Sequence, residues 1–159
     1  MNDAVATKFE KDLTSINVHS FLTEWSDVEG YFINADHIAE LNTSITRERV
    51  QELIDIATAK TKDKSIKALI NIRTEAAVRA RNGGNPHNAG DLAAEAYADY
   101  EADPIKWRRG KIVLNELKAL LHRELKEHAI LFDKSDHLKL PALESIRLII
   151  WPPASVAIV

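Results

Sequence analysis

Cysteine is absent from this chain of 159 residues. Its absence excludes disulfide frameworks, thiolate nucleophiles and zinc sites built on cysteine, and it fits a reducing compartment. The chain also lacks a long apolar run, because none approaches the roughly 18 residues needed to span a bilayer. The first residues, MNDAVATKFEKDL, carry neither the basic start nor the apolar core of a signal peptide. Together these absences predict a cytoplasmic protein.

Glycine and proline are scarce, with five of each, and they occur in clusters. The turns of a β-sandwich would bring such residues back about every ten positions, so this pattern favours helices. A large charge of one sign is also missing, because the formal net charge is only -3. The chain as a whole therefore has no strong attraction to nucleic acids or membranes, and any surface of that kind has to be local.

What remains is the composition of an ordinary globular protein, with 45% hydrophobic and 28% charged residues. The length fits one domain that buries a core without disulfides or metals. We expect a single all-α domain over residues 1–159, a bundle of five to six helices in which residues 1–16 form a lid helix. The core helices are expected to begin near Phe21, Arg47, Lys64 and Lys111.

The first of these core helices is predicted as one long seam. Its apolar residues recur every three or four positions, at Phe21, Trp25, Val28, Phe32, Ala35 and Ala39. The next helix is expected to be capped by Thr46 and to carry its apolar residues on one face, namely Val50, Leu53, Ile54 and Ala57. A connection over residues 60–64 then leads to the helix that contains Arg73, and Pro104 is suited to a first helical turn.

The C-terminal part is not decided between helix and strand. Residues 147–151 fit either, because the apolar run is too short for its periodicity to discriminate. The last six residues, ASVAIV at 154–159, are apolar and rich in residues that favour strands. A terminus of this kind is expected to pack on the body of the protein or on a partner.

Residues 111–129 show the clearest helical periodicity and its most informative violation. At about 100° per residue, the apolar side chains fall within one arc, namely Val113, Leu114, Leu117, Leu120, Leu121 and Leu125. Glu124 and His128, four residues apart, point into the same arc. Arg73 interrupts the apolar stripe of its own helix in the same way. Because a charge inside a core needs a partner, we expect Arg73, Glu124 and His128 to form a buried polar network, or to line a pocket or a subunit interface.

A metal centre is not predicted. The chain has no HExxH motif, no Glu-x-x-His pair of the di-iron type and no aspartate-rich calcium loop. Glu124 and His128 together supply only two ligands. We therefore expect neither a metal ion nor another cofactor.

Arg123 and His128 are separated by four residues. This spacing resembles the Arg-x4-6-His motif of HEPN-type ribonucleases, which are small all-α domains that dimerise to bring two such motifs together. Arg81 and His87 show a similar spacing. Glu124 stands where the motif favours a neutral polar residue. The resemblance implies a ribonuclease with Arg123 and His128 as its catalytic residues.

A basic segment, IKWRRGK at residues 105–111, precedes the helix with the clear periodicity. It consists of cations around one aromatic residue, namely Lys106, Trp107, Arg108, Arg109 and Lys111. Such a group can grip phosphates while the tryptophan stacks on a base. The alternative is that these cations neutralise the acidic helix before them, which carries Asp91, Glu95, Asp99, Glu101 and Asp103.

The sequence favours a non-enzymatic protein-interaction or regulatory protein, homodimeric, that binds a macromolecular partner. This hypothesis depends on a helical seam rich in aromatic residues, on the apolar tail and on the lack of a complete catalytic set. The alternative is a nucleic-acid-binding protein or a HEPN-like ribonuclease.

Overall fold

The computed structural model describes residues 7, 11–16, 27–79 and 88–138. The chain divides into two compact units, one over Glu24–Leu138 and the other made of Met1–Thr23 and Lys139–Val159. In the second unit the structure describes little more than residues 11–15, which are helical and agree with the expected N-terminal helix. The predicted lid contact, residues 147–151 with their choice between helix and strand, and the apolar tail at 154–159 lie outside the described residues.

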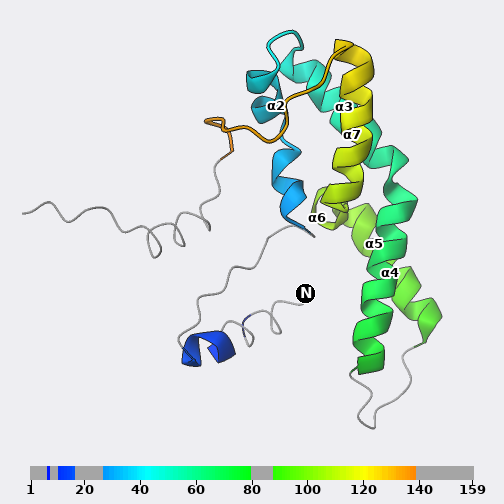
Figure 1. Cartoon of the computed structure of the whole chain (residues 1–159). Coiled ribbons are helices and arrows are strands. Elements are labelled where there is room, and N and C mark those ends of the chain that lie inside the picture. Colours follow the sequence, from blue (N-terminus) through cyan, green and yellow to red (C-terminus); the bar gives the residue numbers. More distant parts are fainter. Residues whose placement is uncertain (1–6, 8–10, 17–26, 80–87, 139–159) are drawn as a thin grey trace, which may run out of the picture. The chain divides into compact units, whose positions relative to one another are not determined.

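The unit Glu24–Leu138 is built from helices, and its described part contains no strand (Figure 1). This confirms the all-α fold. The elements in order are η1 (Val28–Phe32), α2 (Ala35–Leu41), α3 (Arg47–Lys60), α4 (Lys62–Arg79), α5 (Ala89–Ala102), α6 (Pro104–Trp107) and α7 (Gly110–Leu125). Two expected starts are confirmed: the Thr46 side chain caps α3, and Pro104 opens α6.

The predicted seam through Phe32, Ala35 and Ala39 is wrong as one continuous helix. The short 3-10 helix η1 ends at Phe32, and α2 begins only at Ala35. Asn34 causes the break, because its extended backbone stands outside the helix while its side chain accepts hydrogen bonds from the backbone N–H groups of Asp36 and His37. The first two residues of the seam, Phe21 and Trp25, lie outside the described residues.

The connection before α4 is also shorter than predicted, because α3 and α4 are separated by Thr61 alone. The Thr61 side chain is buried and its hydroxyl donates to the carbonyl oxygen of Ala57 at 2.8 Å. This local hydrogen bond satisfies a polar group at the helix end, so the chain needs no solvated linker there.

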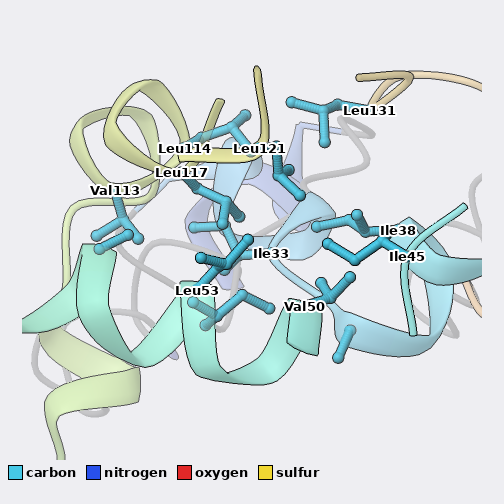
Figure 2. Packing of buried hydrophobic residues seen from close by; sticks show 13 residues of the cluster. Ile33, Ile38, Ile45, Val50, Leu53, Val113, Leu114, Leu117, Leu121 and Leu131 are labelled. Carbon is cyan, nitrogen blue, oxygen red and sulfur yellow. The ribbon is translucent and has the colours of Figure 1, made fainter. Parts of the chain in front are cut away.

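The core lies mainly between α3 and α7, which pack along much of their length, and α2 and η1 close its remaining sides. Figure 2 shows its side chains converging from these elements. The buried apolar side chains of α3 and α7 are Val50, Leu53, Ile54, Ala57, Val113, Leu114, Leu117 and Leu121. They are the apolar residues whose helical spacing predicted a core face.

Gly110 allows η1 and the start of α7 to touch. A Cβ atom at this position would overlap the Asp27 carboxylate and the backbone nitrogen of Gly30. Asp27 in turn accepts a hydrogen bond from the backbone N–H of Lys111 at 3.3 Å. Since Arg109, the residue that precedes α7, makes no side-chain cap, Asp27 supplies the negative charge that stabilises a helix N-terminus from another element.

The segment after α7 is held by two buried polar side chains of the α2 region. Asn42 pairs with the backbone of Ile130 by donating to its carbonyl at 2.8 Å and accepting from its N–H at 2.9 Å. The fully buried His37 ring contacts the carbonyl oxygen of Leu131 through Nε2 at 3.0 Å and the hydroxyl of Ser135 through Nδ1 at 2.7 Å. These bonds fix a segment that has no helix of its own.

Candidate interaction surface

Arg73 does find acidic partners, but they come from the neighbouring helix α5. Its guanidinium forms an ion pair with Asp99 and lies 4.0 Å from the Glu95 carboxylate. The same guanidinium lies over the ring of Trp107 in α6, with 5.5 Å between Cζ and the ring centroid, and Lys106 approaches this ring to 5.3 Å. Arg73 is half-buried. The arginine therefore joins three elements, α4, α5 and α6, on one side of the α4–α5 pair.

The expected pairing of Arg73 with Glu124 is wrong. Glu124 is exposed and accepts two hydrogen bonds from Arg49 of α3, which are 2.9 Å and 3.0 Å long. These bonds lower the pKa of Glu124 below its ordinary value. The physical reason for the error is the packing order, because α7 packs mainly against α3 while α4 packs mainly against α5.

His128 is not on the helix at all. Helix α7 ends at Leu125, and Lys126 turns the chain into the left-handed region with a φ of 58°. The face that Glu124 and His128 were expected to share therefore does not exist. His128 is exposed and stacks on the His122 ring, with 5.3 Å between the ring centroids.

The pair suggested by the HEPN-like spacing is exposed as well. The Arg123 side chain donates through Nε to the carbonyl oxygen of Ala119 on its own helix at 3.2 Å. His128 follows the end of that helix and contacts His122. The second motif, Arg81 with His87, lies outside the described residues.

The basic segment does not form one cationic surface. Arg108 points into the fold, where only 6% of its surface is exposed and where it donates to the carbonyl oxygen of Ile33 at 3.3 Å. Burial lowers the pKa of Arg108 from its ordinary value. Arg109 lies 3.5 Å from the Asp27 carboxylate. Only Lys106 and Lys111 of the four cations are exposed. The four cations that one interpretation of the sequence assigned to phosphate binding therefore do not lie on one exposed surface.

The far end of the α4–α5 pair buries few of its side chains. We call residues 70–79 of α4 and 88–97 of α5 the distal hairpin, and Ala96 is its only buried residue in the described ranges. Three large apolar side chains of the distal hairpin are about half exposed, Ile72 at 52%, Val78 at 55% and Tyr97 at 50%. In Figure 1 this part of the green helices extends beyond the ends of α3 and α7. Two helices that bury so little between them do not form a core of their own.

The two sides of the distal hairpin differ. On α4, the Ser65 hydroxyl accepts from the backbone N–H of Arg109 at 3.1 Å, so this side faces the link between α6 and α7. Thr74, nine residues after Ser65, lies about 180° around the helix from it. On α5, Asp99 meets Arg73 near Trp107, whereas Tyr97, two residues earlier, points about 160° away.

The side opposite α6 is therefore open, and we call it the free flank. It consists of one row from each helix with the spacing of a helical face, namely Ile70, Thr74 and Val78 from α4 with Gly90, Ala94 and Tyr97 from α5. All of these residues are exposed except Ile70, which is half-buried. The free flank is apolar or weakly polar and contains small residues where another helix can approach closely.

The two helices of the hairpin carry opposite charge. In α4 there are five cations, Lys62, Lys64, Lys67, Arg73 and Arg79, against the two anions Asp63 and Glu75, which leaves a net charge of +3. In α5 there are four anions, Asp91, Glu95, Asp99 and Glu101, and no cation, which gives −4. Lys62 pairs with Glu101, and this contact raises the pKa of Lys62. The pairing of the two helices is thus electrostatic as well as apolar.

Within the described ranges no three histidine, aspartate or glutamate side chains gather in a way that could hold a metal ion. None of the helices in those ranges is long and apolar enough to cross a membrane. No protein-family model matches the chain, and no curated protein and no solved structure is significantly similar to it.

The sequence reasoning missed the residues of this surface. Ile72 and Val78 are out of phase with the apolar stripe of their helix, which runs through Ile66, Leu69, Ile70 and Ala77. Apolar residues outside the buried stripe of an amphipathic helix were the available signal. Their exposure could not be predicted, because it depends on how far α4 and α5 extend past the rest of the unit.

Proposed function

We propose that this protein is a non-enzymatic protein-interaction protein and that its distal hairpin is the docking surface. The observation that supports this most is the combination of Ile72, Val78 and Tyr97 at about half exposure with a single buried residue in the whole distal hairpin. Isolated exposed apolar residues are common on proteins. A pair of helix ends with almost no buried side chain is a different case, because it gains stability only when another surface covers it.

The size of that gain is appreciable. Complete burial of a valine or similar side chain is worth roughly 1.5–3 kcal/mol, so covering the exposed half of Val78 contributes about 1 kcal/mol, and the larger ring of Tyr97 at least as much. Several such contacts with a helical partner add up to a useful affinity, since each 1.4 kcal/mol or so changes the dissociation constant about tenfold.

The alternative, a nucleic-acid-binding protein or a HEPN-like ribonuclease, gains no comparable support. Arg108 is engaged inside the fold and Arg109 lies beside Asp27. Arg123 donates to the carbonyl oxygen of Ala119 on its own helix, and His128 stacks on His122.

Site-specific photo-crosslinking tests the proposal directly. A photoreactive phenylalanine derivative is placed at Val78 or Tyr97 in the full chain, and at Ile56 of α3, which is 40% exposed, as the matched control. After irradiation in the expressing cells, we expect discrete crosslinked protein products from the two hairpin positions and none from Ile56. Equal yields from all three positions, or no product from the hairpin, would contradict the proposal.

A further inference from the structure

We infer that the partner of the distal hairpin is a second copy of this chain, related by a two-fold axis that runs along the hairpin and places α4 of each copy beside α5 of the other. This inference rests on the proposed function and names its partner. The free flanks of both copies would then form the centre of an antiparallel four-helix arrangement.

The charges of the hairpin support self-association. A two-fold interface uses the same surface twice, so that surface has to be complementary to itself. The pair of helices meets this requirement because α4 has a net charge of +3 and α5 of −4, and the distal hairpin keeps these signs with +1 in residues 70–79 and −2 in residues 88–97. A second copy rotated about the two-fold axis presents its acidic helix to the basic one and its basic helix to the acidic one.

The same charges select among the possible arrangements. Placing α4 against α4 and α5 against α5 would bring like charges together at both contacts, which is unfavourable. The pairs Lys62 with Glu101 and Arg73 with Glu95 show that α4 and α5 run antiparallel within one copy. An axis along the hairpin keeps this antiparallel order between the copies as well.

The order of residues along the hairpin then predicts which charges meet. Arg79 ends α4 and Asp91 lies in the first turn of α5, so both are at the tip of the hairpin. Lys67 and Glu101 both lie toward its base. With tip beside tip, Arg79 of one copy approaches Asp91 of the other, and Lys67 approaches Glu101. All four side chains are exposed. Within its own chain Glu101 pairs with Lys62 and Arg79 with Glu75, so in the dimer these two side chains would share or exchange partners.

The free flank fits a helix partner sterically. Gly90 and Ala94 present almost no side chain, so a helix can lie close to α5 there. Val78 and Tyr97 then have apolar surface to cover on the opposing helix. The Gly90 position has room as well, since a Cβ atom there would contact only the Asn88 side chain.

Charge reversal with mixing tests this arrangement. The first variant is Lys67→Glu with Arg79→Glu, which makes both helices acidic. The second is Asp91→Lys with Glu101→Lys, which removes the net charge of α5 and places cations where Arg79 and Lys67 of the other copy approach. Light scattering after size exclusion gives the mass of each variant alone and of an equimolar mixture. We expect the wild type to be a dimer and each variant alone to have a dissociation constant raised at least about tenfold. In the mixture, the dissociation constant of the mixed dimer should return to within about threefold of the wild-type value.

Salt gives a second readout of the same idea. Screening weakens attraction between opposite charges and repulsion between like charges. Raising the salt concentration should therefore weaken the wild-type dimer slightly and strengthen self-association of each variant. Circular dichroism of the variants confirms that they fold, and all four substitutions are at exposed positions. Ala94→Glu on the free flank, with Ala119→Glu on α7 as control, provides an independent steric test.

The possible results distinguish the arrangement of the helices, the identity of the partner and the proposed function. A wild-type dimer that both reversed variants keep unchanged, or that mixing does not restore, would overturn the α4 to α5 arrangement. A wild-type monomer up to about 100 µM would overturn the second copy as partner. If the hairpin positions still crosslink to another protein in that case, the proposed function stands and only the inference about the partner fails.

Discussion

Glu124 and Arg49 form a two-point ion pair between α7 and α3, with 2.9 Å from Nε to Oε1 and 3.0 Å from Nη2 to Oε2. The planar guanidinium matches the two carboxylate oxygens, which fixes the relative rotation of the two helices at the end of the core. The hydrogen bonds lower the pKa of Glu124 and raise that of Arg49. Both side chains keep a large exposed fraction, 38% for Glu124 and 41% for Arg49, so the pair is screened by water.

The pair predicts a pH dependence of stability. A carboxyl group whose pKa is depressed in the folded state stabilises the fold at neutral pH, and this contribution is lost as pH falls through the folded pKa. Glu124→Gln should therefore lower the free energy of unfolding slightly at pH 7, and by less at an acidic pH such as about pH 3, because the ion pair is lost as the carboxyl takes up a proton. Urea unfolding at both values measures this, with Glu127→Gln as control. A Glu124→Gln variant with the acid sensitivity of wild type would contradict the role of the pair.

Gly110 predicts a large difference between two glycine substitutions. Gly110→Ala places a Cβ atom against the Gly30 backbone, which cannot move aside without shifting η1 from α7. We expect a loss of about 1–3 kcal/mol in the free energy of unfolding. Gly90→Ala is the matched control, because its Cβ atom meets only the exposed Asn88 side chain at 3.3 Å and alanine favours a helix. Equal effects of the two substitutions in thermal unfolding would refute the close contact.

Lys126 predicts a stabilising substitution. Its φ of 58° is a left-handed conformation that L side chains adopt at some energetic cost. Lys126→Gly should raise the free energy of unfolding by about 0.5–1 kcal/mol, because glycine is the residue that favours this position at a helix end. Lys118→Gly, in the middle of α7, should instead lower it by about 1 kcal/mol. Chemical unfolding of the two variants beside wild type distinguishes the signs.

The sequence and the structure agree where local patterns decide the fold. Thr46 predicted the start of α3, and the spacing of Val50, Leu53 and Ile54 predicted its buried face. They disagree where the determinant lies elsewhere in space. Helix α7 ends where Lys126 adopts a left-handed conformation that is rare for lysine. The sequence therefore contained no residue that is typical of a helix end at this position.

The partners of the charged residues show the same limit. Arg73 and Glu124 were each correctly expected to be paired, but the sequence does not say which helices are neighbours. Because α4 packs mainly on α5 and α7 mainly on α3, Arg73 meets Asp99 and Glu124 meets Arg49. Arg108 is the harder case, since a basic segment with a tryptophan gave no indication that one arginine turns inward to the Ile33 carbonyl.

Substitutions in the distal hairpin and in the core should change the stability of the protein differently. Leu117 is completely buried, so Leu117→Ala should lower the free energy of unfolding by about 2–5 kcal/mol at every protein concentration. Tyr97→Ala, at a half-exposed position, should leave the thermal midpoint of dilute protein almost unchanged. If the hairpin forms the dimer, the wild-type midpoint rises with protein concentration, because association stabilises only the folded chain.

This concentration dependence should disappear in Tyr97→Ala and persist in Leu117→Ala, although the midpoint of the latter is lower throughout. Scanning calorimetry at concentrations spanning about a hundredfold measures both effects in one experiment. A hairpin variant that loses stability even when dilute would mean that Tyr97 already packs within its own chain. The exposed surface of the distal hairpin would then need no partner to explain it.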